Sequence, residues 1–432
     1  MTANGARRAI DAVWRIESPK LIAGLARMVR DIGVAEDLAQ DALVAALEQW
    51  PESGVPDNPA AWLMAIGKRR AIDHFRRTAI AERKHEQLGR ELEVAGQVFE
   101  PDFEGRIDDI GDDLLRLLFV CCHPVLSKEA RVALTLRLLG GLTTGEIARA
   151  FLAPESTVAQ RIVRAKRTLA EARVPFEVPT GVDRAARLSS VLEVIYLIFN
   201  EGYSATGGEE WVRPALCEEA LRLGRVLAGL APDEPEVHGL VALMEIQASR
   251  LRARTDPSGK PVLLLDQDRA KWDHLLIGRG LAALERAERV GGTLGPYPLQ
   301  AAIAACHARA RTAEETDWEQ IVALYDALAQ VMPTPVVELN RAVAVGMAFG
   351  PEAGLELVDE LVSEGSLDGY HLLPSVRGDL LAKLGRHEEA RREFERAASL
   401  TANARERDLL LARAAASPTS TRSRRGRRDN GC

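Results

Sequence analysis

The amino-acid sequence predicts an all-α protein. Ala, Leu, Arg and Glu dominate its 432 residues, whereas aromatic residues make up only 5%, and this composition favours helices throughout. Apolar residues recur at helical spacing, and clusters of Pro, Gly, Asp and Asn divide the chain into segments. The length allows about three domains of ~150 residues each. With 47% hydrophobic residues, each domain can bury a core.

The first clearly marked helix runs from about Val34 to Trp50, and residues 7–30 are expected to form one or two helices that pack against it. Its apolar positions have the spacing of one buried stripe, namely Ala39, Leu43, Ala46, Leu47 and Trp50. Three polar side chains, Asp37, Gln40 and Asp41, share another face. The two carboxylates suit either a partner protein or the positive end of the helix dipole.

A turn rich in helix-breaking residues, PESGVPDNP, leads to a strongly basic second helix. Asn58 is the expected N-cap, with Pro59 as the first helical residue. The expected apolar face consists of Ala61, Met64, Ala65, Ile72 and Phe75. Away from it stand five cations, Lys68, Arg69, Arg70, Arg76 and Arg77. Such a concentration of positive charge on one helix predicts contact with phosphate groups. Trp62 lies between the faces, and we expect it either to pack or to stack on an unpaired base.

Residues 79–112 are expected to form an acidic linker. The stretch 86–113 holds ten acidic and two basic residues, and the sequence EPDFEGRIDDIGDD has no helical period. This segment is interpreted either as a solvated linker or as a run of carboxylates that occupies a cationic channel of a partner.

Residues 113–177 are expected to form four helices, of which the last two make a helix-turn-helix. The first of these two begins at Thr143 or Thr144, and the second follows Pro154. Ile147, Ala148 and Val158 are the expected inward residues. The outward side chains offer hydroxyl, amide and cationic groups, which can reach base edges and phosphates in a major groove. These side chains are Ser156, Thr157, Gln160, Arg161, Arg164, Lys166 and Arg167.

The stretches EDLAQDALVAAL and PAAWLMAIGKRRAIDHFRR resemble region 2 of sigma-70-family factors in the extracytoplasmic-function (ECF) group. LTTGEIARAFLAPESTVAQRIVRAKRTLAEAR resembles region 4, although Pro154 departs from the usual turn. The resemblance implies that residues 1–78 are region 2 and 113–177 are region 4. It implies that Asp37, Gln40 and Asp41 bind core RNA polymerase. By the same resemblance, Asn58, Trp62 and the five cations hold the downstream promoter element, and the outward residues of 156–167 read the upstream element.

Compact ECF factors would end near the Pro-rich segment 174–181, but this chain continues with a predicted helical extension over residues 182–416. DPSGKPVLLLDQDRAKWD interrupts the helices and is expected to be an ordered loop. Gly378, Leu381, Ala390, Phe394 and Ala397 fall on tetratricopeptide-type spacing, which favours a solenoid over an irregular bundle. ECF factors with such an extension are thought to use it to modulate activity, and its ligand is expected to be a protein or a small molecule. The Arg-rich tail 417–432 is expected to be disordered.

Several classes of protein are excluded by composition. No run of ~18 apolar residues occurs, and MTANGARRAIDAVW lacks the apolar core of a signal peptide, so we expect a cytoplasmic protein without membrane contact. The net charge is −7, but the acidity lies mainly in residues 178–416, with 26 basic and 36 acidic groups. Cys121-Cys122-His123 lacks a second pair of metal ligands. We therefore expect no metal, no cofactor and no catalytic residue.

The predicted function is that of an alternative ECF sigma factor with a regulatory C-terminal domain. Such a protein binds core RNA polymerase and promoter DNA and catalyses nothing itself. Two other classes stay open. A helix-turn-helix transcriptional regulator with a ligand-sensing or protein-binding helical domain would bind duplex DNA without polymerase. An enzyme with a catalytic site in residues 182–330 would need a buried cluster of ionisable groups there.

Overall fold

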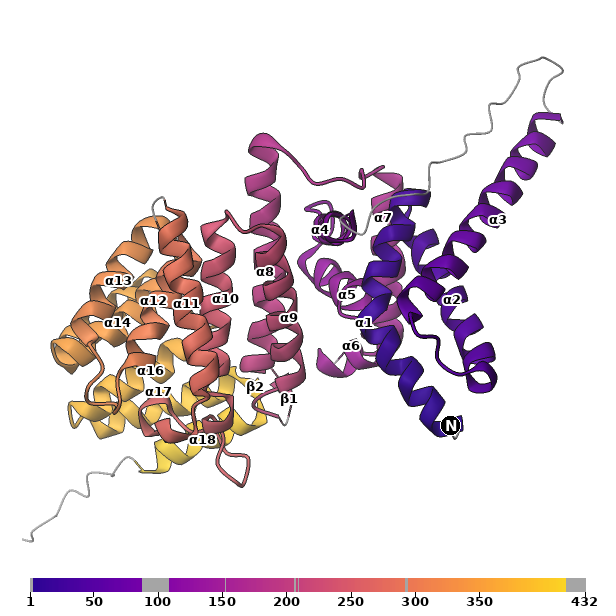
Figure 1. Cartoon of the computed structure of the whole chain (residues 1–432). Coiled ribbons are helices and arrows are strands. Elements are labelled where there is room, and N and C mark those ends of the chain that lie inside the picture. The colour runs from indigo at the N-terminus through magenta and orange to yellow at the C-terminus, as the bar shows by residue number, and fades with distance from the viewer. Residues whose placement is uncertain are drawn as a thin grey trace, which may run out of the picture. The chain divides into compact units, whose positions relative to one another are not determined.

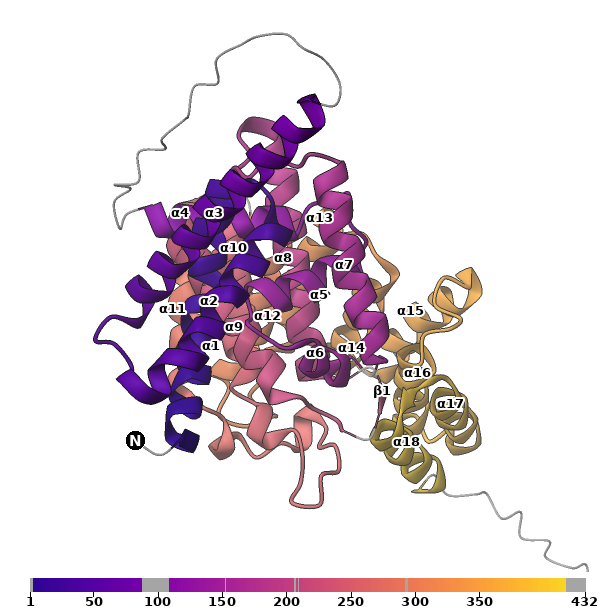
Figure 2. The same cartoon turned by 90° about the vertical axis from the view of Figure 1, so that its right-hand side faces the viewer.

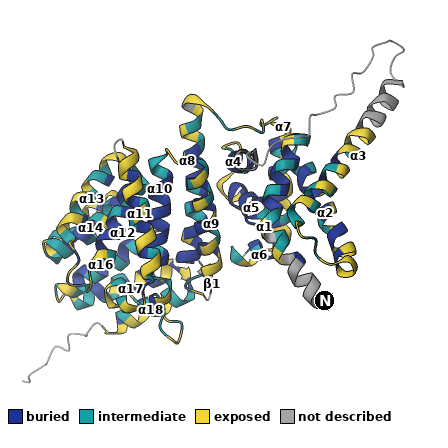
Figure 3. Ribbon diagram, in the orientation of Figure 1, coloured by how far each residue is buried: buried dark blue, intermediate teal, exposed yellow. Residues whose placement is uncertain are grey.

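The computed structural model describes residues 3–87, 109–151, 153–205, 207–208, 210–291 and 294–416 (Figure 1). Its regular structure is almost entirely α-helical, which confirms the predicted fold class. The chain divides into two compact units, residues 1–198 and 199–432. Buried residues lie between packed helices and exposed residues on their outer faces (Figure 3). None of the described helices is long and apolar enough to span a membrane.

Three helices that pack on one another open the first unit: α1 (Ala3–Val29), α2 (Ile32–Ser53) and α3 (Pro59–Gln87). Asp31 caps α2, because its carboxylate accepts from the backbone N–H of Gly33 at 2.7 Å and of Val34 at 2.9 Å. Asn58 caps α3 as predicted, since its side-chain oxygen accepts from the N–H of Ala61 at 3.0 Å. The helix dipole acts mainly within the first turn of a helix. Because α2 begins at Ile32, Asp37 and Asp41 lie beyond that turn and gain little from the dipole.

The buried face of α3 differs from the predicted one. Leu63, Gly67 and Ala71 face the core, whereas Ile72 is 36% exposed and Phe75 is 43% exposed. Gly67 explains the difference, because a Cβ at this position would lie 3.0 Å from the side chain of Leu25 in α1. The glycine lets α1 and α3 approach closely, and so turns two large apolar side chains outward. Leu47 of the predicted α2 stripe is also 38% exposed.

The predicted group of four helices follows: α4 (Asp109–Cys121), α5 (Lys128–Leu138), α6 (Thr144–Ala150) and α7 (Glu155–Glu171). Ser127 caps α5, and Thr143 forms a capping box with Glu146 at the start of α6. The buried stripe of α7 consists of Val158, Ile162, Ala165 and Leu169. These helices contain the predicted helix-turn-helix.

The ends of the acidic linker are helical in the structure. Helix α3 continues to Gln87, and α4 begins at Asp109, inside the predicted 79–112 segment. Asp113 is buried and pairs with Arg27 at 3.4 Å and with Arg116 at 2.6 Å, so it belongs to the core of the first unit. The rest of the predicted linker, residues 88–108, lies outside the described residues.

Helix α8 (Gly181–Tyr203) contributes its residues 181–198 to the first unit. The Ser190 hydroxyl donates to the carbonyl oxygen of Cys122 at 2.7 Å, and Arg187 donates to that of Phe119 at 3.0 Å. Glu193 pairs with Lys128 at 2.5 Å. The stretch predicted to open the extension therefore packs on the helix-turn-helix part of the chain.

The second unit is an array in which each helix packs mainly against its neighbours in the chain (Figures 1 and 2). Its helices are α9 (Pro214–Leu230), α10 (Pro235–Ala248), α11 (His274–Val290), α12 (Pro296–Arg309), α13 (Trp318–Val331), α14 (Pro335–Ala348), α15 (Pro351–Glu364), α16 (Leu372–Lys383), α17 (His387–Leu400) and α18 (Ala404–Ala416). The segment between α10 and α11 contains three short 3₁₀ turns, η1 (Leu251–Ala253), η2 (Leu264–Asp266) and η3 (Arg269–Lys271), of which the last two lie in the predicted loop.

The hairpin of α16 and α17 uses the tetratricopeptide-type positions as its contact face. Gly378, Leu381, Ala390, Phe394 and Ala397 are all buried. A Cβ on Gly378 would lie 2.9 Å from the Phe394 ring, so the small residue is needed for the two helices to approach. This packing is compatible with the predicted solenoid.

The end of the array meets its beginning. Strand β1 (Gly207–Gly208) pairs in parallel with β2 (Ala402–Asn403). The buried Asn403 side chain donates to the carbonyl oxygens of Ala205 at 3.0 Å and of Glu210 at 2.9 Å. Residues about 200 positions apart in the sequence thus hold the array closed at this point.

Candidate functional site

Helix α2 carries an exposed strip that is both acidic and apolar. Asp37 and Asp41 are exposed, and Val44, one turn further along, is 52% exposed. Gln40 is half-buried, and its amide donates to the carboxylate of Glu36 at 3.0 Å. The structure therefore leaves the two predicted aspartates accessible, whereas Gln40 also has an internal contact.

Helix α3 carries a basic surface, which we define as Lys68, Arg69, Arg70, Arg76 and Arg77. The four arginines are exposed and Lys68 is half-buried. None of the four arginines forms an ion pair with a described carboxylate. Ile72 and Phe75, which sequence reasoning placed in the core, lie exposed among these cations. Cations suit phosphate contact, and an exposed aromatic ring between them, such as that of Phe75, is suited to stacking on an unpaired base.

The turn before α3 places the other two predicted residues. Asn58 is exposed, but its side-chain oxygen is engaged in the cap of α3. Trp62 is half-buried, and its ring packs edge-to-face against the buried Trp50, with centroids 5.3 Å apart. Trp62 thus packs on one side and keeps part of its ring at the surface, so the structure accommodates both alternatives.

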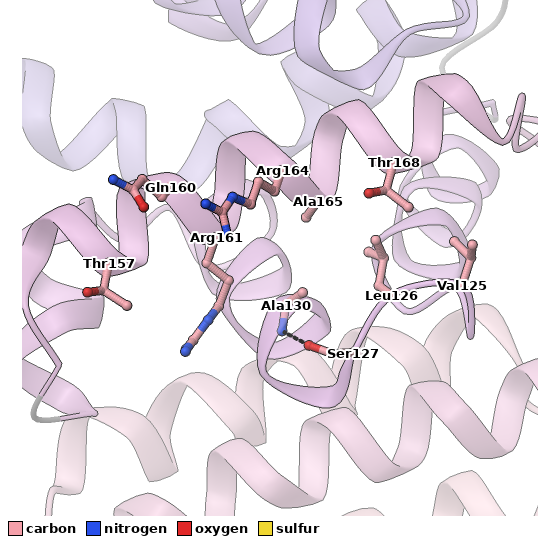
Figure 4. A pocket seen from close by; sticks show the side chains of 10 residues that line it. All are labelled: Val125, Leu126, Ser127, Ala130, Thr157, Gln160, Arg161, Arg164, Ala165 and Thr168. Carbon is pink, nitrogen blue, oxygen red and sulfur yellow. Dashed lines mark hydrogen bonds between the residues drawn. The ribbon is translucent and has the colours of Figure 1, made fainter.

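The outward face of α7 brings most of the predicted helix-turn-helix residues together. Thr157, Gln160, Arg161 and Arg164 line a groove of about 330 Å³ that α7 shares with the start of α5 (Figure 4). Ser156 is exposed one residue before this group. Arg167 is exposed as well, and pairs with Glu171 at 2.6 Å. Hydroxyl, amide and guanidinium groups on one helix face are the donors and acceptors that read base edges.

Lys166 is set apart from the other six. Its ammonium nitrogen lies 2.8 Å from the Glu36 carboxylate of α2, and Arg137 of α5 lies 2.8 Å from the other oxygen of that carboxylate. Glu36 is 4% exposed. Burial alone would raise the pKa of Glu36, but the bonds and charges of Lys166 and Arg137 outweigh it and hold the pKa below its ordinary value. Lys166 therefore joins α7 to α2 in this structure.

Beside this contact lies a hollow of about 560 Å³ between the start of α2 and the end of α7. Arg27, Arg30, Lys166 and Arg173 bring four cations to its lining. Both Arg30 and Arg173 adopt a positive φ, 55° and 47° respectively, which is uncommon for residues other than glycine. Sequence reasoning gave no signal for this hollow, because its residues come from parts of the chain far apart in sequence.

Cys121 and Cys122 are buried core residues. The Cys122 sulfur lies 3.5 Å from the Thr135 hydroxyl, and burial raises the pKa of the Cys122 thiol to about 12. A thiol with so high a pKa is a poor nucleophile and a poor metal ligand at neutral pH. The described residues contain no cluster of three or more side chains suited to hold a metal ion.

Comparison with known protein families identifies the segments that carry these surfaces. Residues 14–80 match sigma-70 region 2, and residues 116–169 match sigma-70 region 4. The chain belongs to the sigma-70 family. Residues 187–288 match a family of unknown function, DUF6596. The two sigma matches contain the basic surface of α3 and the groove of α7, in the order that the sequence predicted.

Relatives of this sigma factor agree with the assignment. "Probable ECF RNA polymerase sigma factor SigI" of Mycobacterium tuberculosis (strain H37Rv) is 28% identical over 175 residues, which cover 40% of this chain and 59% of SigI. "ECF RNA polymerase sigma factor SigK" of Mycobacterium sp. (strain KMS) is 28% identical over 144 residues, covering 32% of this chain and 68% of SigK. "Uncharacterized protein R00370" of Rhizobium meliloti (strain 1021) is 47% identical over 403 residues, covering 92% of this chain and 93% of that protein. No solved structure matches the chain.

The protein is thus an alternative sigma factor of the ECF group, a transcription initiation factor rather than an enzyme. A sigma factor works on promoter DNA with core RNA polymerase. The predicted alternative, a helix-turn-helix regulator that acts without polymerase, is not favoured. In the terms of the family, Glu36 of region 2 holds Arg137 and Lys166 of region 4, and we call this contact the Glu36 seam.

Proposed function

We propose that the three surfaces divide the work of initiation among them. The exposed Asp37–Asp41 strip of α2 docks on core RNA polymerase. The basic surface of α3, with Trp62 beside it, holds the downstream promoter element. The groove of α7 reads the upstream element through Thr157, Gln160, Arg161 and Arg164. The observation that carries this proposal is the exposure of four arginines on α3 without a described carboxylate partner, in a chain whose net charge is −7.

The charge pattern supports this division. Most of the excess acidity lies in residues 178–416, whereas residues 62–90 hold eight basic and three acidic groups. A local cluster of exposed guanidinium groups attracts phosphates whatever the total charge of the chain. The strip of α2 is negatively charged, unlike the basic surface of α3, and therefore suits a basic protein surface rather than DNA.

Lys166 takes a different role in this proposal. We assign it to the Glu36 seam rather than to the upstream element, because its ammonium group is held by a buried carboxylate. The seam keeps region 2 and region 4 in one compact unit. Its strength then sets how readily the two DNA-reading surfaces move apart on the polymerase.

The extension is proposed to modulate this activity. Residues 187–193 of α8 already hold α4 and α5 of region 4 through Arg187, Ser190 and Glu193. A change in the extension can therefore reach region 4 through these contacts. We place the protein in the cytoplasm, together with the polymerase, and expect the extension to respond to a protein or a small molecule.

The test is reconstitution of the full-length protein with core polymerase. Asp37→Asn with Asp41→Asn is expected to weaken binding to the core enzyme at least tenfold. Arg69→Gln with Arg70→Gln is expected to leave that binding intact and to reduce promoter opening at least tenfold. Glu48→Gln, on the exposed side of α2, is the matched control. Unchanged opening by the arginine variant would contradict the role proposed for α3.

A further inference from the structure

The second unit contains an arginine in an unusual setting. The guanidinium of Arg254 lies 3.7 Å from the ring centroid of Tyr203 and 5.5 Å from that of Trp211. Its Nε is buried and has no hydrogen-bond partner among the described residues. Rings on a guanidinium face fix its orientation and leave the nitrogen-bearing edge for another group.

A second arginine lies beside the first. Arg250 is 5.7 Å from the Tyr203 ring and 5.6 Å from the Trp272 ring. Its Nε is also buried and unpartnered among the described residues. Its Nη2 donates to the side-chain oxygen of Gln247 at 3.2 Å. Both guanidinium groups thus lie near the Tyr203 ring, and each also lies near one tryptophan ring.

Arg269 shows what a purely structural arginine looks like in the same segment. It lies 5.0 Å from the Trp272 ring, but it donates to the carbonyl oxygens of His307 and Ala310 and to the Thr316 hydroxyl. Its hydrogen-bonding groups are therefore used within the protein. By contrast, Nε of Arg250 and Nε of Arg254 have no partner among the described residues, although all three arginines lie between α10 and α11.

The positive charge of this region has no described counter-charge. Neither Arg250 nor Arg254 lies within salt-bridge distance of a described carboxylate, and the nearby Glu201 already pairs with Arg213. Burial lowers the pKa of Arg254, and the charge of Arg250 lowers it further, although Tyr203 acts in the opposite direction. Both arginines are half-buried, and holding two like charges together is unfavourable unless an opposite charge offsets them.

Buried polar atoms without a hydrogen-bond partner among the described residues gather here. Among the described residues, twelve buried side-chain nitrogen or oxygen atoms have no hydrogen-bond partner, and six of them belong to this neighbourhood. They are Nε of Arg250 and Arg254, the Tyr203 hydroxyl, Oε1 of Gln267, Nε1 of Trp272 and Nδ1 of His307. Native proteins leave few such groups, and a cluster of them needs an explanation. Nε of Arg250, Nε of Arg254 and Nε1 of Trp272 can only donate, which suits an acceptor-rich partner, whereas Oε1 of Gln267 can only accept.

We propose that Tyr203, Trp211, Arg250, Arg254 and Trp272 form an anion site that binds a phosphate or carboxylate group of a small molecule. Guanidinium forks match the two oxygens of either group, and such charge-assisted bonds are about twice as strong as neutral ones. The aromatic rings hold the two forks in place before the anion arrives. Arginine is not deprotonated at neutral pH, so the site is one of binding rather than of acid–base catalysis.

The anion site adjoins the closure of the helical array. The backbone N–H of Ala205 donates to the carbonyl oxygen of Trp211 at 3.1 Å, and the carbonyl oxygen of Ala205 accepts from Asn403. An anion held against Trp211 therefore touches the segment that joins the first and last turns of the second unit. A bound anion would stabilise the pairing of β1 with β2. The site could in this way report the presence of a small anionic metabolite to the helical array.

The first experiment is a titration of the full-length protein at constant ionic strength with inorganic pyrophosphate, with citrate, and with chloride as reference. Trp211 and Trp272 are two of the six tryptophans that contribute to the fluorescence signal, and the melting temperature reports on linkage between binding and folding. We expect saturable binding and a rise in melting temperature with pyrophosphate, citrate or both. Pyrophosphate alone would identify a phosphate site, and citrate alone a carboxylate site. A response no larger than that to chloride would overturn the proposal.

The second experiment locates the binding. Arg254→Met and Arg250→Met are each expected to weaken it at least tenfold, whereas Arg252→Met, at an exposed position in the same segment, should leave it unchanged. If the arginines serve only to hold the loop, Arg252→Met and Arg254→Met will bind alike. Arg254→Lys keeps the charge without the fork and replaces Arg254→Met if that variant does not fold. None of these readouts involves transcription, so the result stands apart from the test of sigma activity.

Discussion

Glu36 and Lys166 join the two sigma regions across 130 residues of sequence, with 2.8 Å between carboxylate oxygen and ammonium nitrogen. Arg137 binds the other carboxylate oxygen at the same distance. One buried acidic side chain of region 2 therefore satisfies two cations of region 4. The contact is small, so its removal should loosen the seam without unfolding either region.

Glu36→Gln should lower the stability of the first unit. The amide has no charge to offer, so Lys166 and Arg137 lose their charge-assisted bonds, at a cost of about 1–3 kcal/mol. Urea unfolding of the full-length protein measures the change, with Glu48→Gln as an exposed control on the same helix. If the seam restrains the two regions, Glu36→Gln will also bind core polymerase at least as well as the parent. Equal free energies of unfolding for the two variants would show that the Glu36 seam does not stabilise the folded protein.

The seam should be sensitive to acid. Because the folded-state pKa of Glu36 lies below its ordinary value of 4.5, its ionised form contributes stability that is present above pH 4.5. That contribution is lost as the pH falls through the folded-state pKa. Unfolding free energies measured from neutral pH downward should therefore converge for the parent and Glu36→Gln in acid. A constant difference across that range would contradict the assignment.

Ser190→Ala should destabilise region 4 from within the extension. The Ser190 hydroxyl donates to the carbonyl oxygen of Cys122 and accepts from Arg131, so its loss removes two buried hydrogen bonds. We expect a cost of about 1–3 kcal/mol. The neighbouring Ser189 is exposed, and Ser189→Ala is the matched control. Similar melting temperatures for both variants would show that residues 181–198 are not part of the region 4 core.

Arg164→Gln should weaken binding to upstream promoter DNA in a salt-dependent way. If Arg164 contacts a phosphate, the slope of log K against log salt should become shallower by about 1. Binding is measured with the holoenzyme over a range of salt concentrations, and Arg279→Gln, at an exposed position of the second unit, is the control. A slope that changes equally in both variants would remove Arg164 from the interface.

Local sequence signals predicted the helices and their caps well. Asn58 caps α3 where the sequence placed the cap, because capping depends on residues within one turn. The paired helices α16 and α17 were also readable, since Gly378 and Phe394 have a recognisable spacing.

Contacts between distant parts of the chain were not predictable from these signals. The buried face of α3 was placed wrongly at Ile72 and Phe75, because Gly67 sets it through its contact with α1. The sequence predicted Lys166 to contact DNA, and gave no sign that its ammonium group lies against the Glu36 carboxylate. The role of α8 in the first unit was missed for the same reason, since hydrogen bonds such as Ser190 to Cys122 span 68 residues.

The most direct test of the central claim is run-off transcription of fragmented genomic DNA from the source organism, with its core polymerase and with or without this protein. We predict a new set of transcripts whose start sites share a two-part upstream element, lost when Arg69 and Arg70 are changed to Gln. Identical transcripts with and without the protein, together with no stable complex between it and the core enzyme, would contradict the account.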